Sequence, residues 1–171
     1  NYPFYLAVQD FVANESVTAS QFVGRLDLLK GRLYKQIEPV LLNLIDSHDT
    51  ARFMHLAGNN RDKLKLAAAI QLLLPGMTMI YYGDEYGMTG GNDPDCRRGM
   101  VWDEDYQDKD MFTWYSNLIR IRKETPALLN GELVTCATDD EHAIIKMVRE
   151  LQGKRVTVVF HGENRDVRLE E

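Results

Sequence analysis

The sequence predicts an α/β protein that changes to antiparallel β-structure near its C-terminus. Helical segments alternate with apolar, strand-like runs up to Pro126, a pattern typical of parallel strands covered by helices. Beyond that point, short runs rich in β-branched residues are separated by Asp139-Asp140 and Gln152-Gly153, which are turn signals. We therefore expect a first unit at residues 1–126. Residues 127–171 would form the start of an incomplete β-domain.

Composition excludes several classes of protein. The chain has 171 residues, of which 44% are hydrophobic, enough for one sizeable core. Its net charge of −6 argues against a nucleic-acid partner, because no basic stripe is available to neutralise phosphates. The longest apolar runs are only a few residues long, whereas a membrane span needs about 20. We expect no membrane partner and, since no secretory signal is visible, a cytoplasmic location.

Two further features of the sequence bear on its context. Cys96 and Cys136 lack metal-like spacing, so we expect two free thiols in a reducing compartment. The chain does not begin with Met, which suggests a piece of a longer protein.

The N-terminal quarter predicts helices. Residues 1–5 contain a proline, which cannot continue a ladder, and are expected to form a strand end or turn. An apolar segment at residues 5–12 is expected to be helical. Thr18 and Gln21 have the spacing of a capping box, and apolar residues then recur at helical intervals. The predicted helix covers residues 20–35.

Two short apolar runs are expected to be parallel strands. Val40–Ile45 and Met77–Tyr82 are apolar on both faces, as in strands that are covered on both sides. Between them, Asn60 is a candidate N-cap for a helix whose buried face includes Leu64 and Leu72. A Pro-Gly pair ends that helix.

A polar loop at residues 87–108 is longer than compact domains usually tolerate unless the loop serves binding. Trp102 lies in this loop, and we expect its side chain to be buried rather than to serve as a binding platform. Asp110 is expected to cap a third helix that ends at Thr125-Pro126. Antiparallel strands are expected at residues 133–137, 143–148, 155–161 and 167–169.

Ionisable residues gather where the first strand ends. Asp46, His48, Asp49 and Arg52 follow Val40–Ile45, and strand ends are where α/β enzymes place their chemistry. The alternative is a purely structural role, in which the Asp caps a turn and the His ring is hydrogen-bonded within the protein. A metal site would be formed by Asp46, His48, Asp49 and His55, but their spacing does not put all four on one side of a strand.

Two acidic pairs lie further along the chain. Asp84 and Glu85 end the second strand, and we expect them to anchor loops through backbone hydrogen bonds rather than to act as acid and base. Asp93 and Arg97 are open to a weak surface ion pair or to a contact with a hydroxyl-bearing ligand. The glycine-rich loop around them favours the ligand contact, since a carboxylate and a planar guanidinium suit hydroxyl groups.

Four stretches, in order and spacing, resemble the α-amylase family of retaining glycoside hydrolases, in particular its neopullulanase, cyclomaltodextrinase and maltogenic amylase group. Asn1–Phe4 is similar to the exit of the sixth barrel strand, and Ser47–Thr50 to the end of the seventh. Pro75–Met88 is similar to the eighth strand, and Asp93–Trp102 to the loop after it. The resemblance implies the C-terminal portion of a TIM (β/α)8 barrel, from the exit of strand six through helix eight. The start of an antiparallel β-sandwich would follow.

The resemblance also implies roles for single residues. Asp49 matches the third catalytic carboxylate of the family, and His48 matches the histidine that binds the same sugar. Asp93 and Arg97 match an acidic–basic pair that binds the next sugar. Asp46 departs from the residue usual in the group, and the sequence offers no account of it.

The implied activity is hydrolysis of α-1,4 glucosidic bonds with retention, with α-1,6 bonds left open. The partner would be an α-glucan oligosaccharide such as a maltooligosaccharide, cyclodextrin or pullulan. The family's nucleophile and acid/base carboxyls lie upstream of the matched stretches, so the chain alone is expected to be inactive. No cofactor is expected, and calcium only in parts of a parent protein outside this sequence.

Other interpretations of the sequence stay open. We expect self-association through exposed barrel edges near Leu41 and Ile80, or as a homodimer of the parent. The alternative functions are a non-catalytic sugar-binding or structural module derived from an amylase, and metal-dependent hydrolysis by an unrelated α/β domain.

Overall fold

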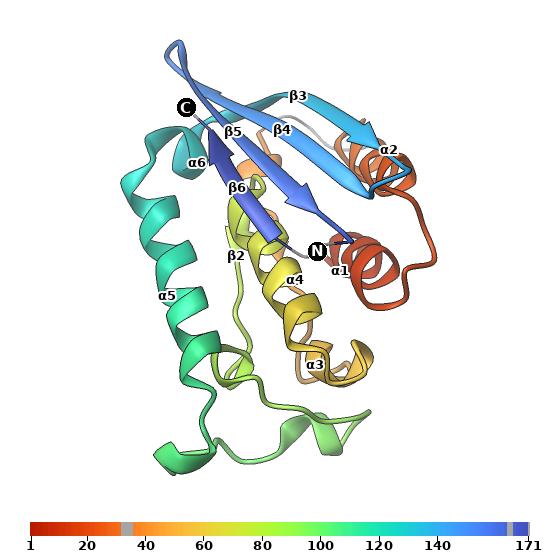
Figure 1. The fold of residues 1–171 in the computed structure, drawn as a ribbon, viewed down its shortest axis with the longest axis vertical. Coiled ribbons are helices and arrows are strands. Elements are labelled where there is room, and N and C mark those ends of the chain that lie inside the picture. The colour runs from red at the N-terminus through yellow and green to blue at the C-terminus, as the bar shows by residue number, and fades with distance from the viewer. Residues whose placement is uncertain (32–35, 164–165, 171) are drawn as a thin grey trace.

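The computed structural model describes residues 1–31, 36–163 and 166–170, and within them helices and a four-stranded sheet share one hydrophobic core. The sheet lies at one end of the molecule, and the long loop lies at the opposite end (Figure 1). The N-terminal elements are α1 (Tyr2–Val8), the π-helix η1 (Gln9–Ala13), α2 (Ala19–Gly31), the 3-10 helix η2 (Glu38–Val40), β1 (Leu42–Asn43), α3 (Phe53–Leu56), α4 (Arg61–Leu73) and β2 (Met77–Thr78). The later elements are the 3-10 helices η3 (Asp84–Tyr86), η4 (Asp95–Arg97) and η5 (Glu104–Tyr106), then α5 (Lys109–Glu124), α6 (Pro126–Asn130), β3 (Glu132–Asp139), β4 (Ile144–Leu151), β5 (Lys154–His161) and β6 (Asp166–Glu170).

The two apolar runs do form parallel strands, as predicted, and the two strands are neighbours. Leu42 pairs with Met77 and Asn43 with Thr78, although the ladder is shorter than either predicted run. Gln71 of α4 donates from Nε2 to the carbonyls of Asn43, at 3.1 Å, and Met79, at 2.7 Å. One buried amide therefore fixes the helix to both strands.

The prediction of a turn or strand end at residues 1–5 is wrong, because α1 begins at Tyr2. The side chain of Asn1 caps this helix and accepts from the backbone N–H of Phe4 at 3.4 Å. Pro3 lies in the first turn, where its missing N–H would have had no partner within the helix. The proline therefore marks a helix start.

The predicted caps are confirmed for two helices and corrected for a third. Thr18 and Gln21 form a reciprocal capping box, with distances of 3.0 and 3.4 Å between each side-chain oxygen and the other's backbone nitrogen. Asn60 caps α4. Asp108, not Asp110, caps α5 and accepts from two backbone N–H groups. The predicted end of the second helix, residues 32–35, lies outside the described residues.

The C-terminal residues form the predicted antiparallel strands, in the order β3-β4-β5-β6. Alternate side chains of this sheet, including Ile145 and Phe160, enter the same core as α1 and α4. Among the described residues the only other sheet is the two-stranded parallel pair of β1 and β2. The start of a β-sandwich therefore stays a prediction.

Two arginines bind backbone carbonyls at the C-terminal end of α4. Arg149 of β4 is almost wholly buried and donates to the carbonyls of Leu73, at 2.8 Å, and Gly131, at 2.7 Å. Arg122 of α5 donates to the carbonyl of Leu74 at 3.0 Å. Burial lowers the pKa of Arg149 to about 10, and the neighbouring Arg122 charge contributes to this shift. These contacts fix the sheet to the helical part of the molecule.

None of the helices in the described part of the chain has the length and hydropathy needed to cross a bilayer.

Candidate substrate-binding site

A tight turn after β1 presents His48 and Asp49. The hydroxyl of Thr50 accepts from the backbone N–H of Ser47 at 2.9 Å, and the hydroxyl of Ser47 accepts from that of Asp49 at 3.2 Å. The turn leaves the side chains of His48 and Asp49 60% and 55% exposed, with His48 Nε2 at 3.1 Å from Asp49 Oδ1. Hydrogen bonds between residues that are close in sequence therefore turn the side chains of His48 and Asp49 toward the solvent.

The long loop brings the other two predicted residues to the same place. Arg97 Nε donates to the carbonyl of His48 at 3.1 Å and pairs with Asp93 Oδ1 at 2.7 Å. A terminal nitrogen of Arg97 lies 3.8 Å from Asp49 Oδ1. The structure thus brings together all four residues that the sequence singled out as catalytic or substrate-binding.

The sequence assigned no role to Tyr2, yet it contacts the same carboxylate. Its hydroxyl donates to Asp49 Oδ2 at 3.3 Å, on the oxygen opposite to the one that faces His48. Position 2 lies in a stretch already noted for its resemblance, but nothing in the sequence shows that α1 would begin there and turn Tyr2 toward Asp49. Asp49 is therefore held through both of its oxygens.

The arrangement suits hydrogen bonding to hydroxyl groups. Asp49 and Asp93 offer carboxylate acceptors, and Arg97 offers planar donors, all exposed. The metal alternative is not supported, because the described residues contain no cluster of three or more His, Cys, Asp or Glu side chains suited to an ion. Asp46 is buried, whereas His48 points outward.

The buried Arg52 connects three segments of the chain. Its guanidinium donates to the carbonyl of Tyr82 after β2, at 2.7 Å, and to the carbonyl of Cys96 in the loop, at 3.0 Å. It also lies 4.5 Å from the ring centre of Tyr81, a cation–π distance. Arg52 thereby fixes the long loop against both strand exits.

The acidic pair after β2 behaves only partly as predicted. Glu85 anchors the local backbone, since it accepts from the N–H of Gly83 at 2.8 Å. Asp84 is instead buried and pairs with the Arg52 side chain at 3.3 Å. Burial of an ion pair depends on tertiary packing, which local sequence does not report.

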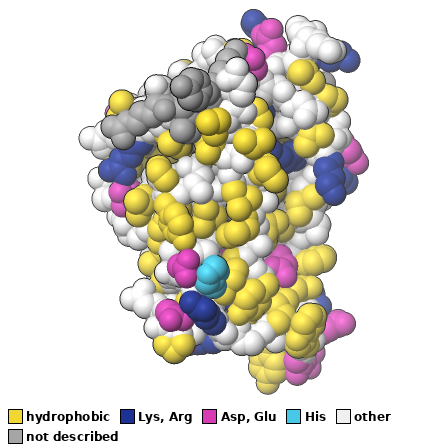
Figure 2. Space-filling model, turned by 180° about the vertical axis from the view of Figure 1, so that it is seen from behind, with side chains coloured by type: hydrophobic (Ala, Val, Ile, Leu, Met, Phe, Trp, Pro, Cys, Tyr) yellow, Lys and Arg dark blue, Asp and Glu magenta, His cyan; other side chains and the backbone are white. Residues whose placement is uncertain are grey.

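Other predictions about this region have mixed outcomes. Cys96 and Cys136 are free thiols, as expected, and the thiol of Cys96 donates to the carbonyl of His48 at 3.3 Å. Burial was the favoured expectation for Trp102, and it is wrong, since this side chain is 81% exposed. Figure 2 shows a histidine among acidic and basic side chains on an open face, next to a broad hydrophobic area.

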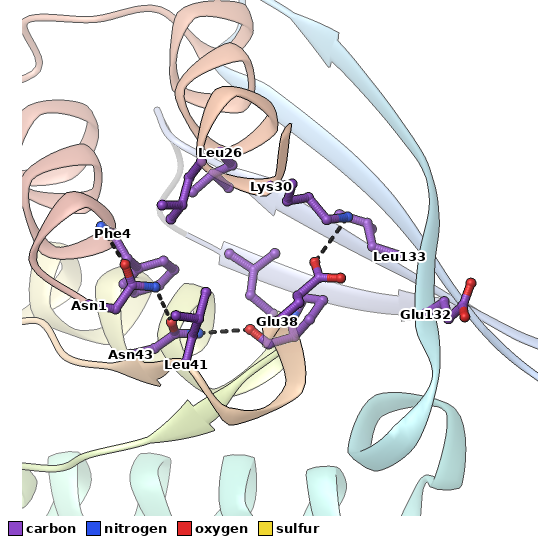
Figure 3. A pocket seen from close by; sticks show the side chains of 12 residues that line it. Asn1, Phe4, Leu26, Lys30, Glu38, Leu41, Asn43, Glu132 and Leu133 are labelled. Atoms are coloured by element: carbon purple, nitrogen blue, oxygen red, sulfur yellow. Dashed lines mark hydrogen bonds and ion pairs between the residues drawn. The ribbon is translucent and has the colours of Figure 1, made fainter. Parts of the chain in front are cut away.

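A separate pocket of about 230 Å³ lies between α1, α2, β1 and β3 (Figure 3). Its lining is mainly apolar, and its polar groups include pairs such as Asn1 with Asn43 and Lys30 with Glu38. It contains none of the four predicted site residues. We therefore assign the candidate chemistry to the exposed cluster and not to this pocket.

Comparisons with known proteins found similar sequences and structures. The family model described as alpha amylase, catalytic domain, matches residues 1–107. The chain is 40% identical to a cyclomaltodextrinase of Thermoanaerobacter pseudethanolicus and 38% identical to neopullulanase 2 of Thermoactinomyces vulgaris, over 96% and 99% of its length. It is 34% identical to an intracellular maltogenic amylase of Bacillus subtilis, over 96% of its length.

A solved structure of a cyclomaltodextrinase superposes with a TM-score of 0.89 and 38% identity, covering 94% of this chain and 28% of that one. The chain spans 28–29% of the length of the three curated relatives. It therefore corresponds to part of their length, in a family whose catalytic domain is a TIM barrel. With the family model matching well over half of the residues, the chain belongs to the α-amylase family of glycoside hydrolases.

Proposed function

We propose that this chain supplies the substrate-binding side of the active site of a retaining α-glucan hydrolase. The observation that carries the proposal is the convergence of His48, Asp49, Asp93 and Arg97 from two segments almost 50 residues apart. In this proposal Asp49 and His48 bind the sugar at the cleavage point. Asp93 and Arg97 bind the next sugar.

Asp49 would act by differential binding. Its exposed carboxylate accepts hydrogen bonds from hydroxyls of the sugar, and these bonds strengthen as the ring flattens toward the transition state. Retaining hydrolysis also requires a nucleophile and a proton donor about 5 to 5.5 Å apart. We propose that both lie in a part of the longer relatives that this chain does not span, so the chain alone does not hydrolyse glycosides.

The proposed substrates are maltooligosaccharides, cyclodextrins and pullulan. The names of the cyclomaltodextrinase and neopullulanase relatives support this choice, and the intracellular maltogenic amylase supports a cytoplasmic location. Exposed apolar side chains on both parallel strands, Leu42 and Met77, support the proposal that the isolated chain self-associates.

We further propose a domain boundary near residue 127, with residues 1–126 belonging to the barrel. The change from alternating helices and strands to an antiparallel sheet supports it. Residues 127–171 would then contribute one sheet of a β-sandwich.

Replacing Arg97 by Ala in the whole protein is expected to raise KM for a maltooligosaccharide about tenfold, with a smaller effect on kcat. Arg97 contacts Asp49 and Asp93 and, in this proposal, also binds the sugar. Its replacement removes that sugar contact, and a tenfold change in KM corresponds to about 1.4 kcal/mol. Steady-state kinetics on the variant and the unmodified protein would measure this.

Arg98→Ala is the matched control. Arg98 is similarly exposed but forms its ion pair with Asp95, at 2.7 Å, which is not one of the four site residues. The KM of the Arg98→Ala variant should change less than about twofold, because this exposed pair lies outside the proposed sugar contact. Equal effects of the two substitutions would show that only the loop's general order matters, and that the proposed sugar contact is absent.

A further inference from the structure

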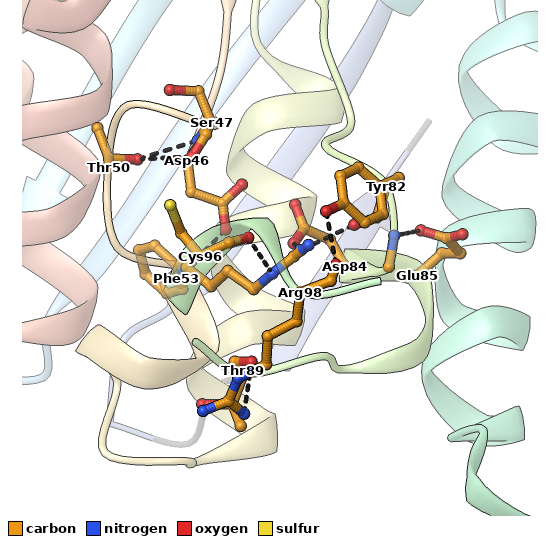
Figure 4. A network of polar contacts seen from close by, with 12 residues as sticks. Asp46, Ser47, Thr50, Phe53, Tyr82, Asp84, Glu85, Thr89, Cys96 and Arg98 are labelled. Carbon is orange, nitrogen blue, oxygen red and sulfur yellow. Dashed lines mark hydrogen bonds and ion pairs between the residues drawn. The ribbon is translucent and has the colours of Figure 1, made fainter. Parts of the chain in front are cut away.

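The exits of the two parallel strands carry a buried pair of carboxyl groups. Asp46 follows β1 and is 1% exposed, and Asp84 begins η3 after β2 and is 2% exposed. Each of the two carboxyl groups acts on the pKa of the other. Figure 4 shows them facing each other below the turn that contains Ser47.

Each carboxyl group has one oxygen that accepts from a neighbouring residue and one that does not. Asp46 Oδ2 accepts from the backbone N–H of Phe53 at 2.6 Å, and Asp84 Oδ1 accepts from Arg52 at 3.3 Å. Asp46 Oδ1 and Asp84 Oδ2 are buried, and no N–H or O–H group of any other described residue donates to either of them. Since ionised carboxylates only accept, these two oxygens can bond to each other only if one of them carries a proton.

The charge balance requires the same proton. Arg52 is wholly buried and is the cation that faces the pair. Two carboxylates beside one guanidinium would leave a net negative charge in the core, which is costly. Among the described residues, the other ionisable groups that act on the pair are Tyr5, Tyr115 and Glu85, and none of these adds a positive charge.

We propose that Asp46 and Asp84 share one proton at neutral pH, and that this bond holds the two strand exits together beneath His48 and Asp49. Both residues are positioning residues, since they act on the site through the backbone that they connect. The proposal concerns this chain's own core and does not depend on the proposed sugar substrate.

The electrostatics of the two groups agree with the geometry. Burial raises the pKa of Asp46 above its usual range. Burial also raises the pKa of Asp84 well above its usual range, and the charge and hydrogen bond of Asp46 raise it further, against the opposing effect of Arg52. Tyr115 stays neutral beside them, because burial holds its pKa well above 10.

A shared proton makes stability fall as pH rises. Unfolding exposes two carboxyls that ionise above a pKa of about 3.9, so the unfolded chain releases the proton that the folded chain holds. The stabilisation is complete below that pKa and is lost progressively until the pKa of the pair is reached. Within this window the pair alone lowers the folding equilibrium constant about tenfold for each pH unit.

Single Asn substitutions provide the first test. In Asp46→Asn or Asp84→Asn, an amide N–H replaces the shared proton, so either variant should lose the pair's pH dependence and become more stable than the unmodified chain at pH 8. Asp105→Asn, an exposed position, is the control and should keep the original slope. Denaturant unfolding of the chain between pH 5 and 8 measures all four proteins. Single variants that lose stability equally at every pH would overturn the proposal.

The double variant Asp46→Asn/Asp84→Asn separates a proton from simple packing. The double variant leaves the buried Arg52 without a carboxylate. The equilibrium constant for folding of the double variant should therefore be at least about tenfold below that of either single variant. Infrared difference spectroscopy on the unmodified protein gives a result that does not depend on how well any variant folds. A protonated carboxyl band at pH 7 is expected. Its absence would show that both groups are ionised and that the proposal is wrong.

Discussion

Replacing Asp49 by Asn in the whole protein is expected to lower kcat for α-glucan hydrolysis by about 10²- to 10³-fold. Asn keeps the size and one acceptor oxygen, but it removes the negative charge and offers a donor where Tyr2, His48 and Arg97 now meet an acceptor. The carboxylate's hydrogen bonds to the sugar are those that strengthen as the ring distorts, so kcat should fall more than KM rises. Steady-state kinetics on a maltooligosaccharide and a cyclodextrin measure both constants.

Asp110→Asn is a suitable control for that substitution, because Asp110 is exposed in the first turn of α5 and is not among the residues of the cluster. It should retain nearly full turnover, and thermal unfolding should show that both variants stay folded. If Asp49→Asn keeps most of its turnover, Asp49 is not a catalytic residue and the assignment of the cluster fails.

Replacing Arg149 by Met is expected to lower the free energy of unfolding by about 2–4 kcal/mol. Met fills similar space, but it leaves the carbonyls of Leu73 and Gly131 buried without their donor. Those carbonyls lie where α4 and α6 meet the sheet, so the substitution weakens the attachment between the two parts of the chain. Denaturant unfolding of the two proteins measures the difference.

Arg155→Met provides the comparison, since Arg155 is also in a strand of this sheet but is 69% exposed and pairs with Glu150 at the surface. Exposed pairs contribute under about 1 kcal/mol, so this variant should be nearly as stable as the unmodified chain. Similar decreases for the two substitutions would show that Arg149 does not act through its buried carbonyl contacts.

Helices were predictable from the sequence where a capping residue and the helical spacing of apolar residues indicated the same segment. Asn60 and the capping box at Thr18 are local signals, and each forms the predicted bonds. The start of α1 was missed because a proline at position 3 fits both a strand end and a first helical turn. Asp108 and Asp110 are both capping residue types two positions apart, so the sequence alone does not decide between them.

The parallel strands show a different limit of prediction from the sequence. The apolar runs predicted the parallel strands correctly, but a ladder forms only where a neighbouring strand provides partners, which in this chain happens at two residues of each run. Strand length is therefore a property of the sheet and not of the run. The antiparallel strands, each paired along nearly all of its length, were predicted closer to their observed bounds.

The residue pattern indicated the two regions of the candidate site, but their convergence was predictable only through resemblance. His48 and Asp49 are adjacent in sequence, yet nothing in the local pattern places Arg97 beside them. Tyr2 was missed because its contact depends on the direction of α1. The buried pairing of Arg52 with Asp84 was missed because burial of charge is decided by packing between distant segments.

We propose that this chain binds the sugar but does not cleave the glycosidic bond, and a turnover assay on the isolated chain tests this proposal. The purified 171-residue chain and the whole protein are incubated with the same maltooligosaccharide, and released reducing sugar is measured. We expect turnover by the whole protein and none by the chain. Hydrolysis by the chain alone would contradict it, because the bond-cleaving carboxyls would then lie within these residues.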